Sequence, residues 1–138
     1  MKLLVLLVCL FSLAALSEPN DGACMNSGAM MLGLDWRGRM VGYPQDCFSL
    51  NTCLYMLCQI YGETDVARVA VQPLGPDPNP KNFPGYSDCM NSGAIIVGYD
   101  FNNTMITHKK CSYQNECLRT MCQINSIPGV SYVTVMPY

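Results

Sequence analysis

The sequence predicts an α+β fold made of two tandem disulfide-stapled β-β-α-β repeats, each a small antiparallel sheet with one helix packed on it. Three observations lead to this prediction: a duplicated cassette, apolar runs of strand length followed by a helical stripe, and an even set of cysteines. The residues Cys-Met-Asn-Ser-Gly-Ala at 24–29 return at 89–94, and Cys-Leu-x-x-x-Cys-Gln-Ile at 53–60 returns at 117–124.

Residues 1–17 have the composition of a secretory signal peptide. Lys2 supplies a positive start, Leu3–Leu16 is an almost wholly apolar stretch of 14 residues, and Ala15–Ser17 is a small-x-small cleavage site. The apolar stretch is short for a membrane span, which disfavours the alternative of an uncleaved anchor. We therefore expect a secreted, extracellular protein whose mature chain begins at Glu18.

The chain beyond the leader divides into three parts. Repeat one spans residues 18–73, a proline-rich linker spans 74–88, and repeat two spans 89–138. The prolines of the linker predict an extended, stiff spacer. The sequence leaves open whether the repeats pack together, although 50% hydrophobic against 13% charged residues favours packing.

The mature chain holds an even number of cysteines, four in each repeat: Cys24, Cys47, Cys53, Cys58, Cys89, Cys111, Cys117 and Cys122. In an oxidising compartment such a set predicts a disulfide framework. Zinc is the competing interpretation. It is disfavoured because the chain has no C-x-x-C pair and its single histidine, His108, has no counterpart in repeat one. We expect no metal and no other cofactor.

Each repeat is expected to hold a strand, a return strand, a helix and a third strand. The strands are expected at 29–34, 39–43 and 66–71 in repeat one and at 94–99, 104–108 and 130–135 in repeat two. Apolar residues at helical spacing from Leu50 to Tyr61 predict the first helix. Ser49 or Asn51 is its expected cap, and Gly62 its expected end.

Two kinds of turn are duplicated. Asp35–Gly38 and Asp100–Asn103 each start with Asp and end with a residue that tolerates a left-handed backbone, which predicts a hairpin with a type I turn. The triplet Asn-Ser-Gly ending at Gly28 and at Gly93 is either a ligand loop or a backbone bend beside a disulfide, and we favour the bend.

Helical geometry restricts the disulfide pairing. Cys53 and Cys58 are five residues apart on one helix, roughly 8 Å between Cα atoms, which is too far for a disulfide. Two connectivities per repeat remain: Cys24–Cys58 with Cys47–Cys53, or Cys24–Cys53 with Cys47–Cys58. We favour the first, because Cys47 lies just before the helix and Cys53 in its first turns. The equivalent cysteines of repeat two follow the same argument.

No residue set has the pattern of a catalytic site. The chain has one histidine and no Gly-x-Ser-x-Gly motif, and only Asp35 and Asp100 are carboxylates common to both repeats. Their turn role explains them, and the dispersed carboxylates do not form a calcium loop. Loss of Lys2 leaves seven basic and ten acidic residues, a net charge of about −3. We therefore expect no enzyme, no nucleic-acid partner and no membrane partner.

The candidate binding residues are Trp36 and its counterpart Phe101, each second in a hairpin turn. An exposed aromatic side chain there is a stacking platform for sugar or protein; the alternative is a ring that packs back onto the neighbouring repeat. Asn102 begins the sequon Asn-Asn-Thr at a hairpin tip and is the expected site of N-glycosylation.

Part of each repeat resembles the PAN/apple modules, which bind proteins or carbohydrates through a sheet crossed by a helix. The resemblance rests on Gly33-x-Asp35-x-x-Gly38 followed by Ser49-x-x-x-Cys53 and a second helix cysteine. The chain departs from that family: its helix cysteines are five residues apart where the family's are closer, and its strand after the helix has no cysteine. The sequence is therefore not assigned to it.

We favour a non-enzymatic structural protein, such as a component of an extracellular coat or shell organic matrix. The reasons are the predicted secretion, the disulfide framework, the stiff proline-rich spacer and the lack of a catalytic residue pattern. The alternative is a soluble recognition protein, a lectin-like, defence or signalling factor, that binds sugar or protein through the hairpin tips. An extracellular protein or carbohydrate is the expected partner in either case, and the sequence leaves the oligomeric state open.

Overall fold

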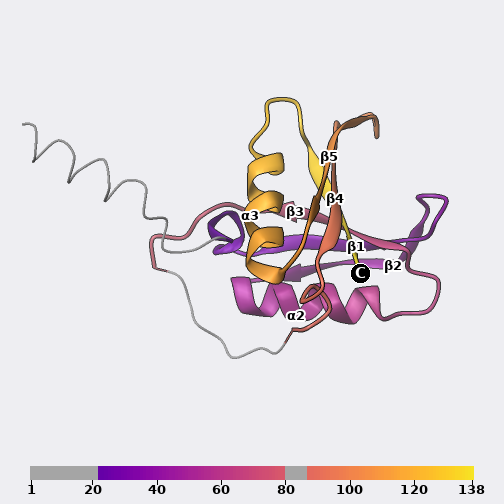
Figure 1. Ribbon diagram of the computed structural model, residues 1–138, viewed down its shortest axis with the longest axis horizontal. Helices are drawn as coiled ribbons and strands as arrows, with labels where there is room; N and C mark the ends of the chain where they lie inside the picture. The colour runs from indigo at the N-terminus through magenta and orange to yellow at the C-terminus, as the bar shows by residue number, and fades with distance from the viewer. Residues whose placement is uncertain (1–21, 80–86) are drawn as a thin grey trace, which may run out of the picture.

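The computed structural model describes residues 22–79 and 87–138 (Figure 1). The predicted signal peptide 1–17 and the linker residues 80–86 lie outside these ranges. The described elements, in chain order, are η1 (Ala23–Met25), β1 (Ala29–Leu34), β2 (Met40–Cys47), α2 (Leu50–Tyr61), β3 (Arg68–Pro73), β4 (Ala94–Tyr99), β5 (Met105–Cys111), α3 (Gln114–Asn125) and β6 (Tyr132–Pro137).

The described strands form one antiparallel sheet of six strands in the order β2-β1-β3-β6-β4-β5. The α+β class is therefore correct, but the expectation of a separate small sheet in each repeat is wrong. The third strands of the two halves pair with each other, and Ala70 lies opposite Thr134 at the centre of that pairing. A third strand that ended its own sheet would leave a row of unpaired backbone groups, and pairing with the equivalent strand satisfies both rows.

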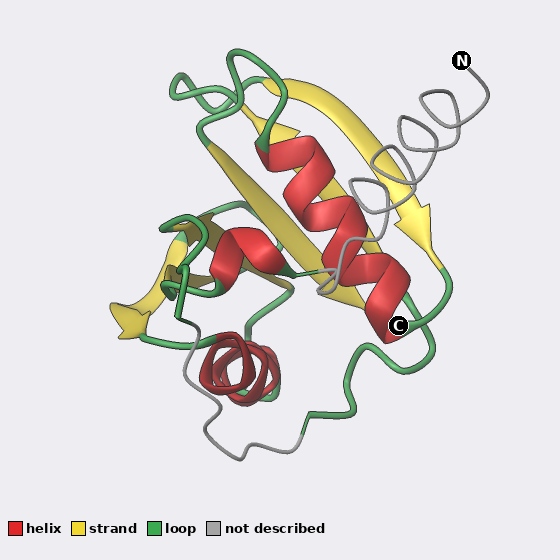
Figure 2. Cartoon of the chain, turned by 90° about the vertical axis from the view of Figure 1, so that its left-hand side faces the viewer, coloured by secondary structure: helices red, strands yellow, loops and turns green. Residues whose placement is uncertain are grey.

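Both helices cover the same face of this sheet. α2 packs on β1, β2 and β3, and α3 packs on β4, β5 and β6. Figure 2 shows α3 lying along the strands of its half, with α2 seen nearly end-on. The fully buried valines of the central strands, Val69, Val71, Val133 and Val135, lie beneath the helices and join both halves in one hydrophobic core.

Two glycines let the helices approach the sheet closely. A Cβ atom at Gly33 would lie 3.1 Å from a methyl group of Ile60 in α2, and a Cβ at Gly98 would lie 2.6 Å from one of Ile124 in α3. A side chain there would force these methyl groups to move, which fits the presence of glycine at the fifth position of the first strand in both halves.

The helix cap and most strand positions agree with the sequence predictions. The Ser49 side chain accepts a hydrogen bond from the Thr52 amide, the Thr52 hydroxyl accepts one from the Ser49 amide, and Gly62 ends α2. β1 and β4 have the predicted bounds. The third strands begin two residues later than predicted, at Arg68 and Tyr132. β2 continues through the predicted lead-in to Cys47, because it pairs with β1 as far as that residue.

Two disulfides are local to one half each. Cys47 pairs with Cys53, and Cys111 pairs with Cys117, with Cα atoms 5.1 Å apart in both. Each joins the end of a return strand to the first turns of the following helix. This part of the favoured connectivity agrees with the structure.

The other two disulfides cross between the halves, so the Cys24–Cys58 pairing favoured from the sequence is wrong. Cys24 pairs with Cys122 on α3, and Cys58 on α2 pairs with Cys89. A Cys24–Cys58 pairing would require each repeat to be closed on itself. The shared sheet instead places each opening cysteine beside the helix of the other half, where η1 contacts both helices.

The duplicated Cys-Met-Asn-Ser-Gly-Ala segment has a structural role. Its methionines, Met25 and Met90, are fully buried. Its glycines, Gly28 and Gly93, have φ angles of 104° and 95°, and a Cβ atom at either would collide with the carbonyl oxygen of the cysteine that ends the return strand. The segment is the predicted backbone bend, and it fills the core and carries the crossing disulfide.

The first residues of the predicted linker are bonded to the N-terminal half. The Leu74 amide donates to the Gly28 carbonyl over 2.9 Å, and the Gly75 amide donates to the Cys24 carbonyl over 2.8 Å. These bonds continue the third strand past its end and hold the bend in place.

Loss of a crossing disulfide should cost more stability than loss of a local one. Cys24–Cys122 encloses a separation of 98 residues and Cys47–Cys53 one of 6. Loop-closure entropy gives about 4.7 kcal/mol for a loop of roughly 100 residues and about 2 kcal/mol for a loop of roughly 6. Denaturant unfolding of the two double serine variants measures the difference, and a non-reducing peptide map of the unmodified protein checks the pairing. Equal losses, or a peptide linking Cys24 to Cys58, would contradict the structure.

Candidate functional site

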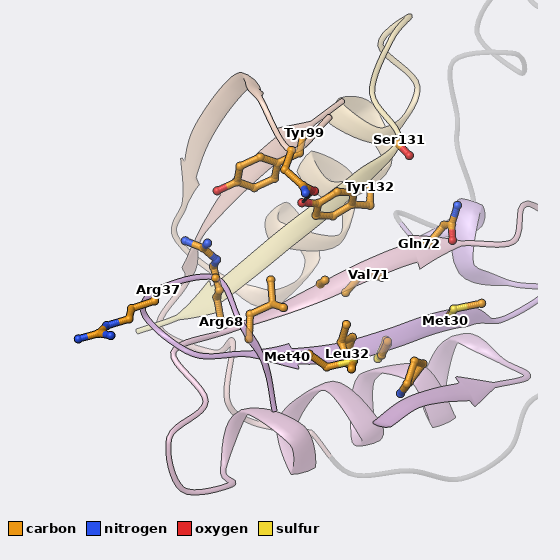
Figure 3. Close-up of a pocket in the computed structure, with 16 residues that line it drawn as sticks. Met30, Leu32, Arg37, Met40, Arg68, Val71, Gln72, Tyr99, Ser131 and Tyr132 are labelled. Atoms are coloured by element: carbon orange, nitrogen blue, oxygen red, sulfur yellow. Dashed lines mark hydrogen bonds between the residues drawn. The ribbon is translucent and has the colours of Figure 1, made fainter. Parts of the chain in front are cut away.

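The face of the sheet opposite the helices carries an open groove with a volume of about 610 Å³ (Figure 3). It lies over the central strands. Its floor is formed by the side chains that stand between the buried valines along each strand and so point to the opposite face. Its lining residues are Met30, Met31, Leu32, Leu34, Arg37, Gly38, Met40, Pro44, Arg68, Ala70, Val71, Gln72, Tyr99, Asn103, Ser131 and Tyr132. The groove therefore receives residues from both halves of the chain.

Arg68 is the cation within the groove. Its guanidinium carbon lies 5.8 Å from the centre of the Tyr99 ring, which is within range for a cation–π contact. Figure 3 shows the side chain between the tyrosine pair and the side chains of Leu32 and Met40. Among the described residues, no atom hydrogen-bonds the buried Nε of Arg68. An unpaired buried donor costs free energy, so an acceptor that reaches this guanidinium would be stabilised.

Tyr99 and Tyr132 form a stacked pair on adjacent strands. Their ring centres are 5.3 Å apart and the rings are 15° from parallel. The Tyr132 hydroxyl donates to Oδ1 of Asn103 over 2.7 Å, which ties the hairpin tip of the C-terminal half to the groove. Burial, reinforced by the neighbouring Tyr99, raises the pKa of the Tyr132 phenol, so the hydroxyl stays protonated and keeps this bond at neutral pH.

The charge of the groove is opposite in sign to that of the whole protein. The chain has a net charge of −2, yet the lining includes two arginines and no carboxylate. The Arg37 guanidinium lies over the neighbouring Trp36 ring, 4.8 Å from its centre, and Figure 3 shows Arg37 pointing away from the cavity. Arg68 is therefore the arginine that acts inside the groove.

The hairpin turns have the predicted geometry. The Gly38 amide donates to the Asp35 carbonyl, and the Asn103 amide donates to the Asp100 carbonyl. Gly38 and Asn103 have φ angles of 81° and 64°, the left-handed conformation that the sequence predicts. The Asp35 carboxylate also accepts hydrogen bonds from the amides of Arg37 and Arg39 at 2.9 and 2.8 Å.

Both predicted binding aromatics are exposed at these tips. Trp36 is 75% exposed and Phe101 is 81% exposed, so neither ring packs back onto the other half. Their neighbours Arg37 and Asn103 line the groove, which places both tips at its border. Asn102 is also exposed at its tip, where its backbone N–H donates to the Asp100 carboxylate. Its glycosylation stays a prediction.

The described residues hold no group of three or more His, Cys, Asp or Glu that could bind a metal ion. They also include no helix long and apolar enough to cross a membrane. All eight predicted disulfide cysteines are paired.

Arg68, Tyr99 and Tyr132 were not singled out from the sequence, although a signal for them existed. In the third strands, Arg68 and Tyr132 stand directly before Val69 and Val133, which are buried beneath the helices. Strand alternation sends such residues to the opposite face, and an arginine or tyrosine there is notable. What the sequence did not show is that the two third strands are neighbours, which brings these residues into one groove.

Comparison with protein-family models, with curated proteins and with solved structures finds no match to this chain. The functional inference therefore depends on the geometry of the groove and of its two bordering tips.

Acidification should protonate the Asp35 carboxylate with a midpoint below 3.8, the ordinary pKa of this group. The Arg39 amide is the largest cause that lowers the pKa of Asp35 below 3.8, and the Arg37 amide and the Arg39 guanidinium add to it. Because folding lowers the pKa of Asp35, the ionised carboxylate stabilises the folded state at pH values above the pKa of the unfolded chain. This contribution is lost as the pH falls through the pKa of the folded state. An NMR titration of the Asp35 carboxyl carbon, with the Trp36 indole as a second probe, measures this. A midpoint at or above 3.8 would contradict the hydrogen-bonded turn.

Proposed function

We propose that this protein is a secreted, non-enzymatic recognition module that binds its ligand in the groove between the two hairpin tips. The observation that carries the proposal is the composite groove itself, an Arg68 guanidinium and a tyrosine pair above an apolar floor, open to solvent and bordered by two exposed aromatic side chains. Binding sites in proteins are usually concave and mostly apolar, with a few placed polar groups.

The disulfides and the duplicated segments of the chain give further support to the proposal. Four disulfides fit an oxidising compartment and so support secretion through the predicted leader 1–17. The same pairing leaves none of the eight mature cysteines available as a nucleophile, which supports a binding role. The duplicated segments and the equivalent element order of the halves, β-β-α-β in each, support an origin as two fused repeats.

A structural component of an extracellular coat or shell matrix is the second candidate function. The observation that favours it is the amount of exposed apolar side chain beyond the groove, which a protein embedded among other molecules would cover. These residues include Tyr43, Phe48, Leu74, Ile127 and Tyr138. N-glycosylation at Asn102 is compatible with either function and would place a glycan beside Phe101.

Truncation of the tip aromatics should weaken binding without destabilising the fold. Trp36→Ala and Phe101→Ala, alone and together, are expected to change the free energy of unfolding by less than about 0.5 kcal/mol, because both rings are exposed. Loss of an interface aromatic costs about tenfold or more in affinity. Binding to a glycan array and to proteins of the soluble extracellular fluid, compared with thermal unfolding, measures both effects.

Tyr43→Ala is the matched control, because Tyr43 is an aromatic residue that is 84% exposed and does not line the groove. It should leave binding unchanged. Equal loss of binding in the control and the tip variants would mean that the tips have no special role. A large loss of stability in Trp36→Ala would mean that this ring supports the fold.

The distribution of the mature protein separates the two candidate functions. Mass spectrometry of soluble secretions and of washed, denaturant-resistant extracellular material would detect peptides of the mature chain in one or both. Recovery mainly from the fluid supports the recognition module. Enrichment in the resistant fraction would favour the matrix role.

A further inference from the structure

We propose that the groove binds an amphipathic carboxylate, a small organic acid with an unbranched apolar chain, with its carboxylate on Arg68 and its chain over the methionine and leucine floor. The inference rests on the proposed function, since it names the ligand class of the same groove. Three features carry it: the sign of the charge, the free donors of Arg68 and the chemistry of the floor.

Charge complementarity points to an anion. The protein is acidic overall, yet the groove contains arginine and no carboxylate. Among the described residues, no carboxylate forms an ion pair with Arg68; Asp35 pairs with Arg39 instead. A partly buried, unneutralised arginine in a concave site raises the local concentration of anions.

The donor geometry of Arg68 points to a carboxylate. The guanidinium presents donors in a planar fork that matches the two oxygens of a carboxylate. The Tyr99 ring lies against this guanidinium, and a Cβ atom at Gly38 would lie 3.2 Å from its Nη2. Glycine at the hairpin tip thus lets the guanidinium lie close to the tip backbone, where a larger residue would crowd it. Because Nε itself is buried, a carboxylate in the groove would engage the terminal nitrogens of the guanidinium.

The floor points to an apolar chain. Beyond Arg68 the groove is lined by Leu32, Met30 and Met40, and the two methionines are 42% and 59% exposed. Methionine side chains are flexible and adapt to an apolar ligand. A volume of about 610 Å³ lies in the range of small-molecule sites and holds an extended chain.

The polar groups fit a carbohydrate less well. Sugar recognition needs free aromatic faces and many hydrogen-bonding groups, but the Tyr99 and Tyr132 rings stack on each other. Oδ1 of Asn103 already accepts the Tyr132 hydroxyl. An inorganic anion would use Arg68 alone and would leave the floor exposed.

Calorimetric titration of the unmodified protein with decanoate, decanol and acetate tests the proposal. Decanoate supplies the carboxylate and the chain, and the other two each supply one part. We expect decanoate to bind about tenfold or more tightly than either, since a charge-assisted hydrogen bond and a buried chain each contribute at least that much. The Arg68 Nε–H resonance should shift during the decanoate titration. Equal affinity for decanol and decanoate, or an unchanged resonance, would overturn the proposal.

Arg68→Gln should weaken decanoate binding about tenfold to a hundredfold. Lys109→Gln is the matched control, because it removes one positive charge from an exposed position outside the groove. Arg68→Lys keeps the charge and loses the fork, and it should fall between the two. Circular dichroism and the disulfide map verify that each variant folds, and unchanged binding in a folded Arg68→Gln variant would overturn the proposal.

Failure of this inference can be distinguished from failure of the proposed function. If decanoate does not bind while the Trp36 and Phe101 variants still lose a glycan or protein ligand, the ligand class is wrong and the recognition module stands. If decanoate does not bind and no ligand depends on the tips, both proposals fall.

Discussion

The pairing of β3 with β6 is the interaction on which the rest of the structure depends. It joins two three-stranded units into one sheet, with Ala70 opposite Thr134 at its centre. Because antiparallel neighbours place directly opposed side chains on the same face, this one pairing puts both helices on one side and leaves the other side open. The core becomes continuous across the pairing, which offsets the small size of either half.

The crossing disulfides follow from the same pairing. Each half alone has a helix cysteine and an opening cysteine that the sequence assigns to each other. In the joined molecule the opening segment lies between the two helices, so Cys24 meets α3 and Cys89 meets α2. These two covalent links keep the halves joined as long as the disulfides are intact.

The parts of the fold that are set within a few residues were predictable, and the parts that join distant residues were not. A turn that begins with Asp35 and ends with Gly38, a cap at Ser49 and a disulfide across six residues each depend on neighbours in the chain. The crossed pairing, in which Cys24 bonds to Cys122 and Cys89 bonds to Cys58, does not depend on neighbours in the chain. The two halves carry the same cassette, so either cysteine satisfies the local pattern, and only the long-range sheet decides between them.

The same reasoning applies to the candidate site. The place of Trp36 and Phe101 in tight turns left two outcomes open, exposure or packing onto the other repeat, and the structure shows exposure at the border of a groove. The groove itself was hidden, because its residues come from strands that are about sixty positions apart in the chain. The alternation of Arg68 with valines is visible in the sequence and places Arg68 on the opposite face of its strand. That this face also carries residues of the other half follows only from the pairing of β3 with β6.

The frame of the molecule is symmetric, whereas the groove is not. Leu34 and Tyr99 hold the same position at the ends of their strands, as do Arg68 and Tyr132 at the starts of theirs. If equivalent positions held equivalent residues, the open face would present two like sites. Instead one half contributes the cation and the apolar floor, and the other contributes the stacked rings that lie against that cation. The helix-covered side keeps matched valines and glycines in both halves, because packing requires them. The open side, where packing does not require matched residues, therefore presents one asymmetric groove and not two like sites.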